Sequence, residues 1–149
     1  MRNLGIFSAN AKFDSMATIT TVYKGGLRTE ATHVQSGNTI ITDAPVDNQG
    51  RGEAFSPTDL LAGALGSCML TIMGIAANNH GFDIDGTKIE VLKVMGANPR
   101  KVAEVHVTFN MPSNNYDDHT RKIIEKAAHT CPVALSLHPD LKQIITFNW

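Results

Sequence analysis

Apolar and polar positions alternate along the N-terminal third of the chain, and this alternation predicts strands. It runs through residues 18–34 and again through residues 38–45, where β-branched side chains are frequent. Turns that contain glycine interrupt it, so we expect three short strands in a meander. Residues 43–55 are rich in Gly, Asn and Asp and are predicted to form a loop.

The second half of the chain shows both strand and helix periodicity. Alternation returns in residues 83–96 and 101–112, which predicts a hairpin of two longer strands. Residues 117–131 have the spacing of an amphipathic helix, with inward positions that include Ile123, Ile124 and Ala127. A short helical turn is expected next, in residues 132–140. Residues 141–149 are predicted to form the last strand.

A long helix between these halves is apolar on every side. Ser56 suits the N-cap, Pro57 the first helical position and Asp59 a capping box, and no charged side chain occurs from Leu60 to Ala77. A helix that is apolar all round is buried all round, and a small domain cannot cover it alone, so we expect it at a subunit interface. Its length approaches that of a membrane span, but its glycines and the lack of flanking Lys or Arg argue against membrane insertion.

The order β-β-β-α-β-β-α-α-β predicts an α+β fold in one domain, over residues 16–149. A chain of 149 residues is long enough for one substantial core. Met16 is a plausible start, so residues 1–15 are treated as a leader or extended N-terminus of unknown role. They lack the apolar region of a signal peptide, and we expect a cytoplasmic protein.

Composition excludes several functional classes. The net charge is -1 and no basic stripe is present, so nucleic acid is not an expected partner. Two cysteines do not make a secreted disulfide framework. The six histidines show no spacing typical of zinc ligands, so we expect no metal.

The two cysteines are the candidate reactive groups, although each could be a small buried apolar residue. Cys68 lies about three turns inside the long helix, where only a cation brought from elsewhere would favour a thiolate. Cys131 precedes Pro132, which suits an N-cap, and free N–H groups at a helix start favour negative charge. On that ground alone Cys131 could be the first to react.

Three motifs together resemble the OsmC/Ohr family of osmotically inducible protein C and organic hydroperoxide reductases. They are "GGLRTEA", "SPTDLLAGALGSC" and "CPVALSL", and they occur in this order with the expected strands and helices. The resemblance covers residues 16–149. It implies an intertwined homodimer with interfacial active sites that reduce organic hydroperoxides with thiols, without a cofactor.

The resemblance also implies a role for each matching residue. Cys68 matches the cysteine that attacks the peroxide, Cys131 the resolving cysteine, and Arg28 the arginine that stabilises the thiolate. An external thiol or dithiol, such as a lipoyl group, would reduce the resulting disulfide. An apolar wall is expected to favour organic peroxides, and its residues are Leu61, Leu65, Met69 and Ile72.

One position departs from the family pattern. Many members carry a glutamate directly after the helix-opening proline, where this chain has Thr58. Asp59, which some looser OsmC-like relatives share, or Glu53 in the preceding loop could supply the acid. The departure keeps a second hypothesis open, in which a non-catalytic OsmC-like stress protein binds a small apolar ligand at the dimer interface.

Overall fold

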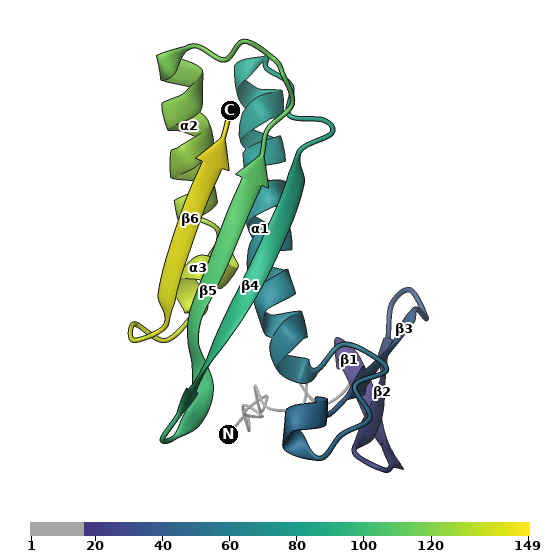
Figure 1. The fold of residues 1–149 in the computed structure, drawn as a ribbon. Helices are drawn as coiled ribbons and strands as arrows, with labels where there is room; N and C mark the ends of the chain where they lie inside the picture. Colours follow the sequence, from purple (N-terminus) through teal and green to yellow (C-terminus); the bar gives the residue numbers. More distant parts are fainter. Residues whose placement is uncertain (1–16) are drawn as a thin grey trace, which may run out of the picture. The chain divides into compact units, whose positions relative to one another are not determined.

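The computed structural model describes residues 17–149, which form two compact units divided between Pro57 and Thr58 (Figure 1). The expected leader of residues 1–15 lies outside the described residues. The single domain expected over residues 16–149 stays a prediction. The order of strands and helices confirms the α+β fold expected from the sequence.

The N-terminal unit contains an antiparallel sheet of three strands in the order β1-β2-β3. The strands are β1 (Ile19–Gly25), β2 (Arg28–His33) and β3 (Thr39–Asp43). Gly25 and Gly26 have positive φ angles of 83° and 59°, which glycine adopts without a steric penalty, and this allows the tight turn into β2. A 3-10 helix, η2 (Val46–Asn48), interrupts the loop that the sequence predicted after β3.

This N-terminal sheet buries almost no apolar surface of its own. Among residues 17–57 only Thr42, Asp43 and Ser56 are buried, and none of them is hydrophobic. Large apolar side chains of the three strands stay exposed, namely Ile19, Val22, Tyr23, Ile40 and Ile41. Since exposed apolar side chains gathered on one small sheet indicate an interaction surface, we expect another surface to cover it.

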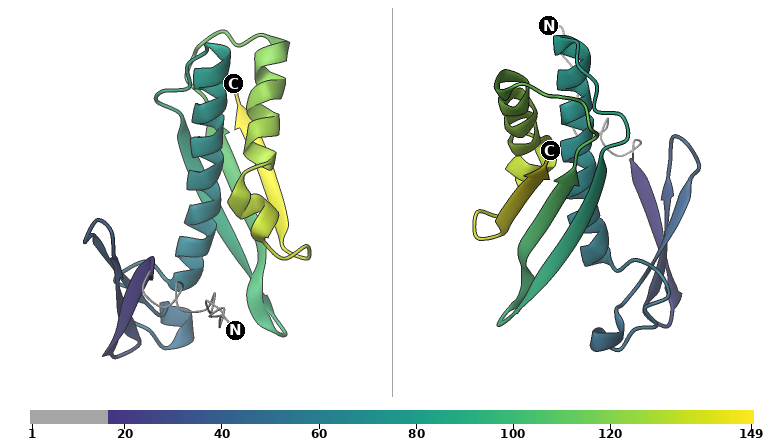
Figure 2. Two further views of the ribbon diagram at one scale, coloured as in Figure 1. Left: turned by 180° about the vertical axis from the view of Figure 1, so that it is seen from behind. Right: turned by 45° about the horizontal axis from the view of Figure 1, so that its top comes forward.

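The larger unit packs helices on one face of a second three-stranded sheet, as both views in Figure 2 show. Its sheet has the order β4-β5-β6, antiparallel between β4 and β5 and parallel between β5 and β6. The strands are β4 (Lys88–Ala97), β5 (Arg100–Asn110) and β6 (Lys142–Asn148). The helices are α1 (Pro57–His80), α2 (Asp118–His129) and α3 (Pro132–Ser136).

The core of the larger unit lies between α1, α2 and β5. Its fully buried side chains are Leu65, Met69 and Met73 from α1, Val105, Val107 and Phe109 from β5, and Ile124 from α2. Phe109 stacks on Phe147 of β6 with ring centroids 4.8 Å apart. Gly66 permits a close approach of α1 to the sheet, because a Cβ there would lie 2.7 Å from Ile89 Cδ1.

Helix α1 presents its other face outward, which differs from the full burial that its composition predicts. Ile75 is 50% exposed, and the small side chains of Ala64, Ser67 and Thr71 are exposed on the same face. A mean hydropathy of 1.9 over eighteen residues would suffice for a membrane span, a test that core helices also pass. Since one face packs in the core, the open face is the part of α1 for which the sequence predicts a partner.

Candidate functional site

Arg28 is held by a buried carboxylate. It is the first residue of β2 and lies directly opposite Asp43, the last residue of β3. Its Nε donates to Asp43 Oδ1 at 2.7 Å and its Nη2 to Asp43 Oδ2 at 2.8 Å. Asp43 is only 1% exposed. The two parallel bonds fix both the direction and the plane of the guanidinium group.

Glu53 adds a second carboxylate to the same arginine. Arg28 Nη2 donates to Glu53 Oε2 at 2.8 Å, and the Glu53 side chain is 63% exposed. The backbone N–H of Glu53 donates to Asp43 Oδ2 at 3.2 Å, which ties the loop to the buried acid. The sequence offers Glu53 and Asp59 as possible acids for this arginine. In the structure Glu53 is the one that binds Arg28.

The titration of this cluster follows from its hydrogen bonds. The hydrogen bond from Arg28 is the main cause that holds the pKa of Asp43 below its usual range, although burial opposes it. Asp43 and then Glu53 raise the pKa of Arg28 above its already high value. The pair is therefore ionised throughout the neutral range.

Asp43 was not among the candidates from the sequence. The sequence nevertheless contains evidence for the pair. A hairpin that turns at residues 34–38 places positions 28 and 43 opposite each other. Opposite charges in directly facing positions of two strands favour a pair. The Gly, Asn and Asp content of residues 43–55 hides this pairing, because it predicts that Asp43 begins a loop.

Asp59, the other acid considered for this role, binds a lysine of β4. Its Oδ1 accepts a hydrogen bond of 2.6 Å from Lys93 Nζ, and the same ammonium group donates to Thr58 Oγ1 at 2.9 Å. These contacts join the start of α1 to β4. Asp59 thus helps to anchor α1 on the sheet.

Cys131 caps α3, as the sequence predicted. It has an extended backbone (φ -67°, ψ 145°), Pro132 follows, and its Sγ accepts a hydrogen bond of 3.3 Å from the backbone N–H of Ala134. The side chain is fully buried. Burial raises the pKa of the Cys131 thiol, the amide of Ala134 opposes this, and the nearby Cys68 thiol raises it further.

Cys68 is the more accessible of the two thiols. It lies on α1, is partly buried and packs against the core to which Cys131 belongs. Both cysteines are free. The fold therefore brings together two thiols that are far apart in sequence, the outer one on α1 and the inner one at the start of α3.

The four residues of the expected apolar wall divide into two groups. Leu65 and Met69 are fully buried in the core, so a substrate would touch them only if the core opened. Leu61 and Ile72 are partly buried. Leu61 contributes to a pocket of about 440 Å³, whose other lining residues are Thr58, Lys101, Val102, Leu137, His138 and Leu141.

Metal-ligating side chains do not cluster in the described part of the chain. Within residues 17–149 no group of three or more His, Cys, Asp or Glu side chains could hold a metal ion. His106, one of the histidines considered from sequence, shares a hydrogen bond of 2.9 Å with Glu104 on the same strand. This contact, together with Lys142, lowers the pKa of Glu104.

Residues 50–145 match the model of the OsmC-like protein family. The chain belongs to this family. The resemblance to the OsmC/Ohr family is therefore confirmed for the chain as a whole, and the OsmC-like fold is confirmed with it. No curated protein matches the sequence.

Solved OsmC-like structures agree with this assignment. A protein from Psychrobacter arcticus, provisionally described as an osmotic stress induced and detoxification response protein, is 57% identical with a TM-score of 0.86, over 90% of this OsmC-like chain and 97% of its own. The organic hydroperoxide resistance protein OsmC from Legionella pneumophila is 15% identical with a TM-score of 0.72, over 91% and 99% of the two chains. An OsmC-like protein from Mycoplasma pneumoniae is 20% identical with a TM-score of 0.74, over 91% and 97%.

Proposed function

We propose that this OsmC-like protein is a thiol-dependent peroxidase that reduces organic hydroperoxides in the cytoplasm. The observation that carries the proposal is the pair of free thiols, one partly accessible on α1 and one fully buried beside it. Similarity in fold to an organic hydroperoxide resistance protein supports the substrate class.

In the first step the Cys68 thiolate attacks the outer oxygen of the hydroperoxide. The S–O bond forms as the O–O bond breaks, so Cys68 is oxidised to a sulfenic acid and the peroxide is reduced to an alkoxide, which takes a proton and leaves as the alcohol. Arg28 is proposed to stabilise the thiolate and the departing alkoxide. Asp43 and Glu53 would hold the arginine in the required plane.

Cys131 is proposed to resolve the sulfenic acid. Its sulfur attacks Cys68 Sγ, a disulfide forms, and the sulfenic hydroxyl leaves as water with the proton of the Cys131 thiol. An external dithiol, such as a dihydrolipoyl group, then reduces the disulfide by thiol exchange. No bound cofactor enters this scheme. The assignment of the first attack to Cys68 rests on its greater exposure, since Cys131 is fully buried.

We also propose that the working unit is a homodimer. The support is the unpartnered face of α1 and the exposed apolar side chains of the β1-β2-β3 sheet, two surfaces that a second copy could cover. On the outward face of α1 a Cβ added at Gly63 or Gly74 would meet nothing within 4 Å. Such glycines allow another backbone to approach closely.

The deciding experiment measures consumption of cumene hydroperoxide and tert-butyl hydroperoxide with dithiothreitol or dihydrolipoamide as reductant. Turnover that disappears in Cys68→Ser supports the proposal. Unchanged consumption in that variant would rule out Cys68 as the nucleophile.

A second candidate is cysteine-independent binding of a small apolar ligand. The pocket that Leu61 lines favours it, because three further lining residues are apolar (Val102, Leu137 and Leu141). Binding of a fluorescent apolar probe that is lost in Leu61→Asp but kept in Cys68→Ser, in a protein without peroxidase activity, would select this candidate.

A further inference from the structure

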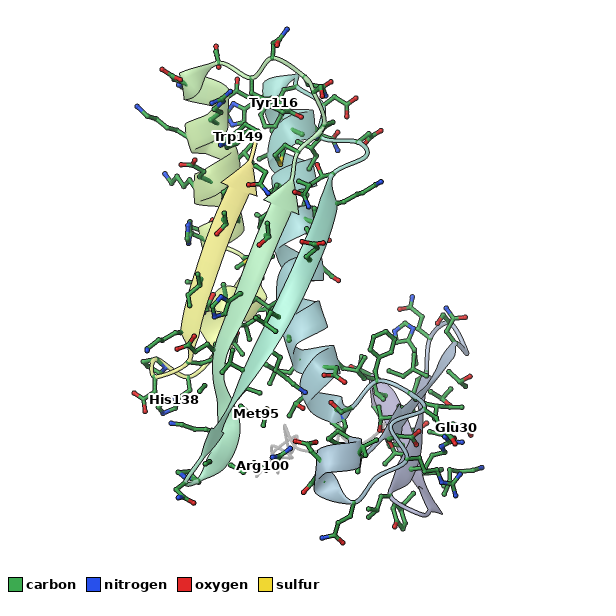
Figure 3. All side chains as sticks on the ribbon, in the orientation of Figure 1. Glu30, Met95, Arg100, Tyr116, His138 and Trp149 are labelled. Atoms are coloured by element: carbon green, nitrogen blue, oxygen red, sulfur yellow. The ribbon has the colours of Figure 1, made fainter. Side chains whose placement is uncertain are left out.

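A cluster of aromatic side chains and one arginine lies where β6 ends. Trp149 stacks on Phe147, with centroids 5.3 Å apart, and meets the edge of Tyr116 at 5.8 Å. The Arg121 guanidinium carbon lies 5.0 Å from the centroid of the Trp149 ring. Figure 3 shows Tyr116 and Trp149 close together at this end of the sheet. The plane of the guanidinium group is therefore restrained before any ligand arrives.

Arg121 uses only part of its donor capacity. Its Nε donates to the backbone oxygen of Tyr116 at 3.1 Å. Across residues 17–149 its two terminal nitrogens have neither a hydrogen-bond acceptor nor a carboxylate partner. Because Nε is engaged, these two nitrogens form an end-on fork, which matches the two oxygens of a carboxylate.

The fork belongs to a pocket of about 220 Å³ with polar walls. Its lining residues are Pro112, Ser113, Asn114, Asn115, Tyr116, Arg121 and Trp149. Among these lining residues Arg121 has the only charged side chain. Ser113 and Asn115 have no side-chain hydrogen bond to any other described residue and could bond a ligand, whereas Asn114 already donates to Asp83 O at 3.2 Å.

An adjoining pocket is lined by acidic side chains. It measures about 470 Å³, shares Asn114, Asn115 and Tyr116 with the first pocket, and is lined by Asp83 and Asp117. A second negative charge that extended in that direction would be repelled by these carboxylates. The pair of pockets thus favours a ligand with a single negative charge at the Arg121 end.

We infer that the Arg121 pocket binds a small hydrophilic monocarboxylate. Its carboxylate would accept from the two terminal nitrogens of Arg121, and a hydroxyl or oxo group would bond Ser113 or Asn115. A phosphate dianion fits less well, since one arginine balances only one charge. This site does not depend on the proposed peroxidase chemistry.

The chain provides its own reporter, because Trp149 is its only tryptophan. Titration with lactate, at an ionic strength kept constant with sodium chloride, should change Trp149 fluorescence saturably. Arg121→Gln should weaken binding about 10-fold or more, since a charge-assisted fork is lost. The neighbouring exposed Lys122→Gln is the matched control, because it removes the same charge from α2 outside the pocket, and it should bind as the parent does.

Calorimetric titration of the same variants separates binding from any direct effect of Arg121 on the fluorophore. If Arg121→Gln does not fold, the exposed pair Ser113→Ala and Asn115→Ala should still weaken lactate binding several-fold. The inference is overturned by any of three results. The first is the absence of a saturable fluorescence change up to about 50 mM lactate, a range that covers millimolar affinity. The second is equal affinity of Arg121→Gln and Lys122→Gln for lactate. The third is tighter binding of inorganic phosphate than of lactate.

Discussion

Arg28 and Asp43 face each other across β2 and β3 and share two hydrogen bonds of 2.7 and 2.8 Å. Asp43 is buried, whereas Glu53, the second acid on Arg28, is largely exposed. Water and ions weaken an exposed pair far more than a buried one. The orientation of Arg28 is therefore expected to depend mainly on Asp43.

Asp43→Asn should lower peroxidase activity because Arg28 loses its buried anchor. We expect kcat/KM for cumene hydroperoxide to fall about 10-fold, and about 100-fold for Arg28→Ala, in line with the loss of one charge-stabilising donor. Glu53→Gln should have a smaller effect. Asp59→Asn is the control, since it removes an acid bound to Lys93, and its activity should stay close to that of the parent. A larger loss in Asp59→Asn than in Asp43→Asn would contradict this assignment.

The same pair predicts how stability depends on acid. The pKa of Asp43 is lowered by Arg28, so its stabilising contribution is complete above the ordinary carboxyl range near pH 4 and is lost as pH falls below it. Thermal melts between about pH 2 and pH 6 should show a steeper decline for the parent than for Asp43→Asn. Parallel curves would show that the pair contributes nothing to acid sensitivity.

Trapping experiments should distinguish the roles of the two cysteines. Cys68→Ser should reduce the rate of peroxide consumption at least 1000-fold, because serine supplies no nucleophile at neutral pH. Cys131→Ser should still react once and leave a sulfenic acid at Cys68 that a dimedone probe labels. Mass spectrometry locates the label. A label on Cys131 in the Cys68→Ser protein, with none on Cys68 in the reciprocal variant, would reverse the two roles.

Disulfide formation should accelerate with pH. Burial raises the pKa of Cys131, so its thiolate becomes abundant only above the ordinary thiol range near 8.5. After one equivalent of peroxide, the rate of Cys68–Cys131 disulfide formation should therefore still increase between pH 8 and pH 10. Stopped-flow mixing followed by thiol alkylation measures this rate. A rate that is flat across this range would indicate that Cys131 does not attack as a thiolate.

Two glycines of α1 should respond in opposite ways to substitution by alanine. At Gly66 a Cβ would lie 2.7 Å from Ile89 Cδ1 and 3.1 Å from Val91 Cγ2, so Gly66→Ala should destabilise the fold by about 1–3 kcal/mol. At Gly63 the space is open within one chain, so for the dissociated chain helix propensity alone predicts a gain of about 0.5–1 kcal/mol. Denaturant titration gives both values.

Substitution of Gly63 also tests the homodimer. If a second chain packs on this face of α1, Gly63→Leu should weaken dimerisation while the isolated chain stays folded. Light scattering across a range of protein concentrations measures the association, and Lys122→Gln is a suitable surface control. A parent protein that is monomeric and stably folded at micromolar concentration would contradict the dimer.

The sequence by itself determined those features that depend on neighbouring residues. Alternation and helical spacing predicted the order of strands and helices, because each period belongs to one type of backbone. Cys131 was placed at an N-cap because Pro132 restricts the residue before it. The inward position of Ile124 followed from the amphipathic pattern of α2.

Only the tertiary structure decided which faces meet. Helix α1 is apolar all round, so periodicity could not show that Leu65 and Met69 enter the core while Ile75 stays exposed. The pairing of Arg28 with Asp43 depended on the register of a hairpin, and a shift by one residue would have separated them. The approach of Cys68 to Cys131 arose from the tertiary fold, since contacts between distant segments leave no local periodic signal in one sequence.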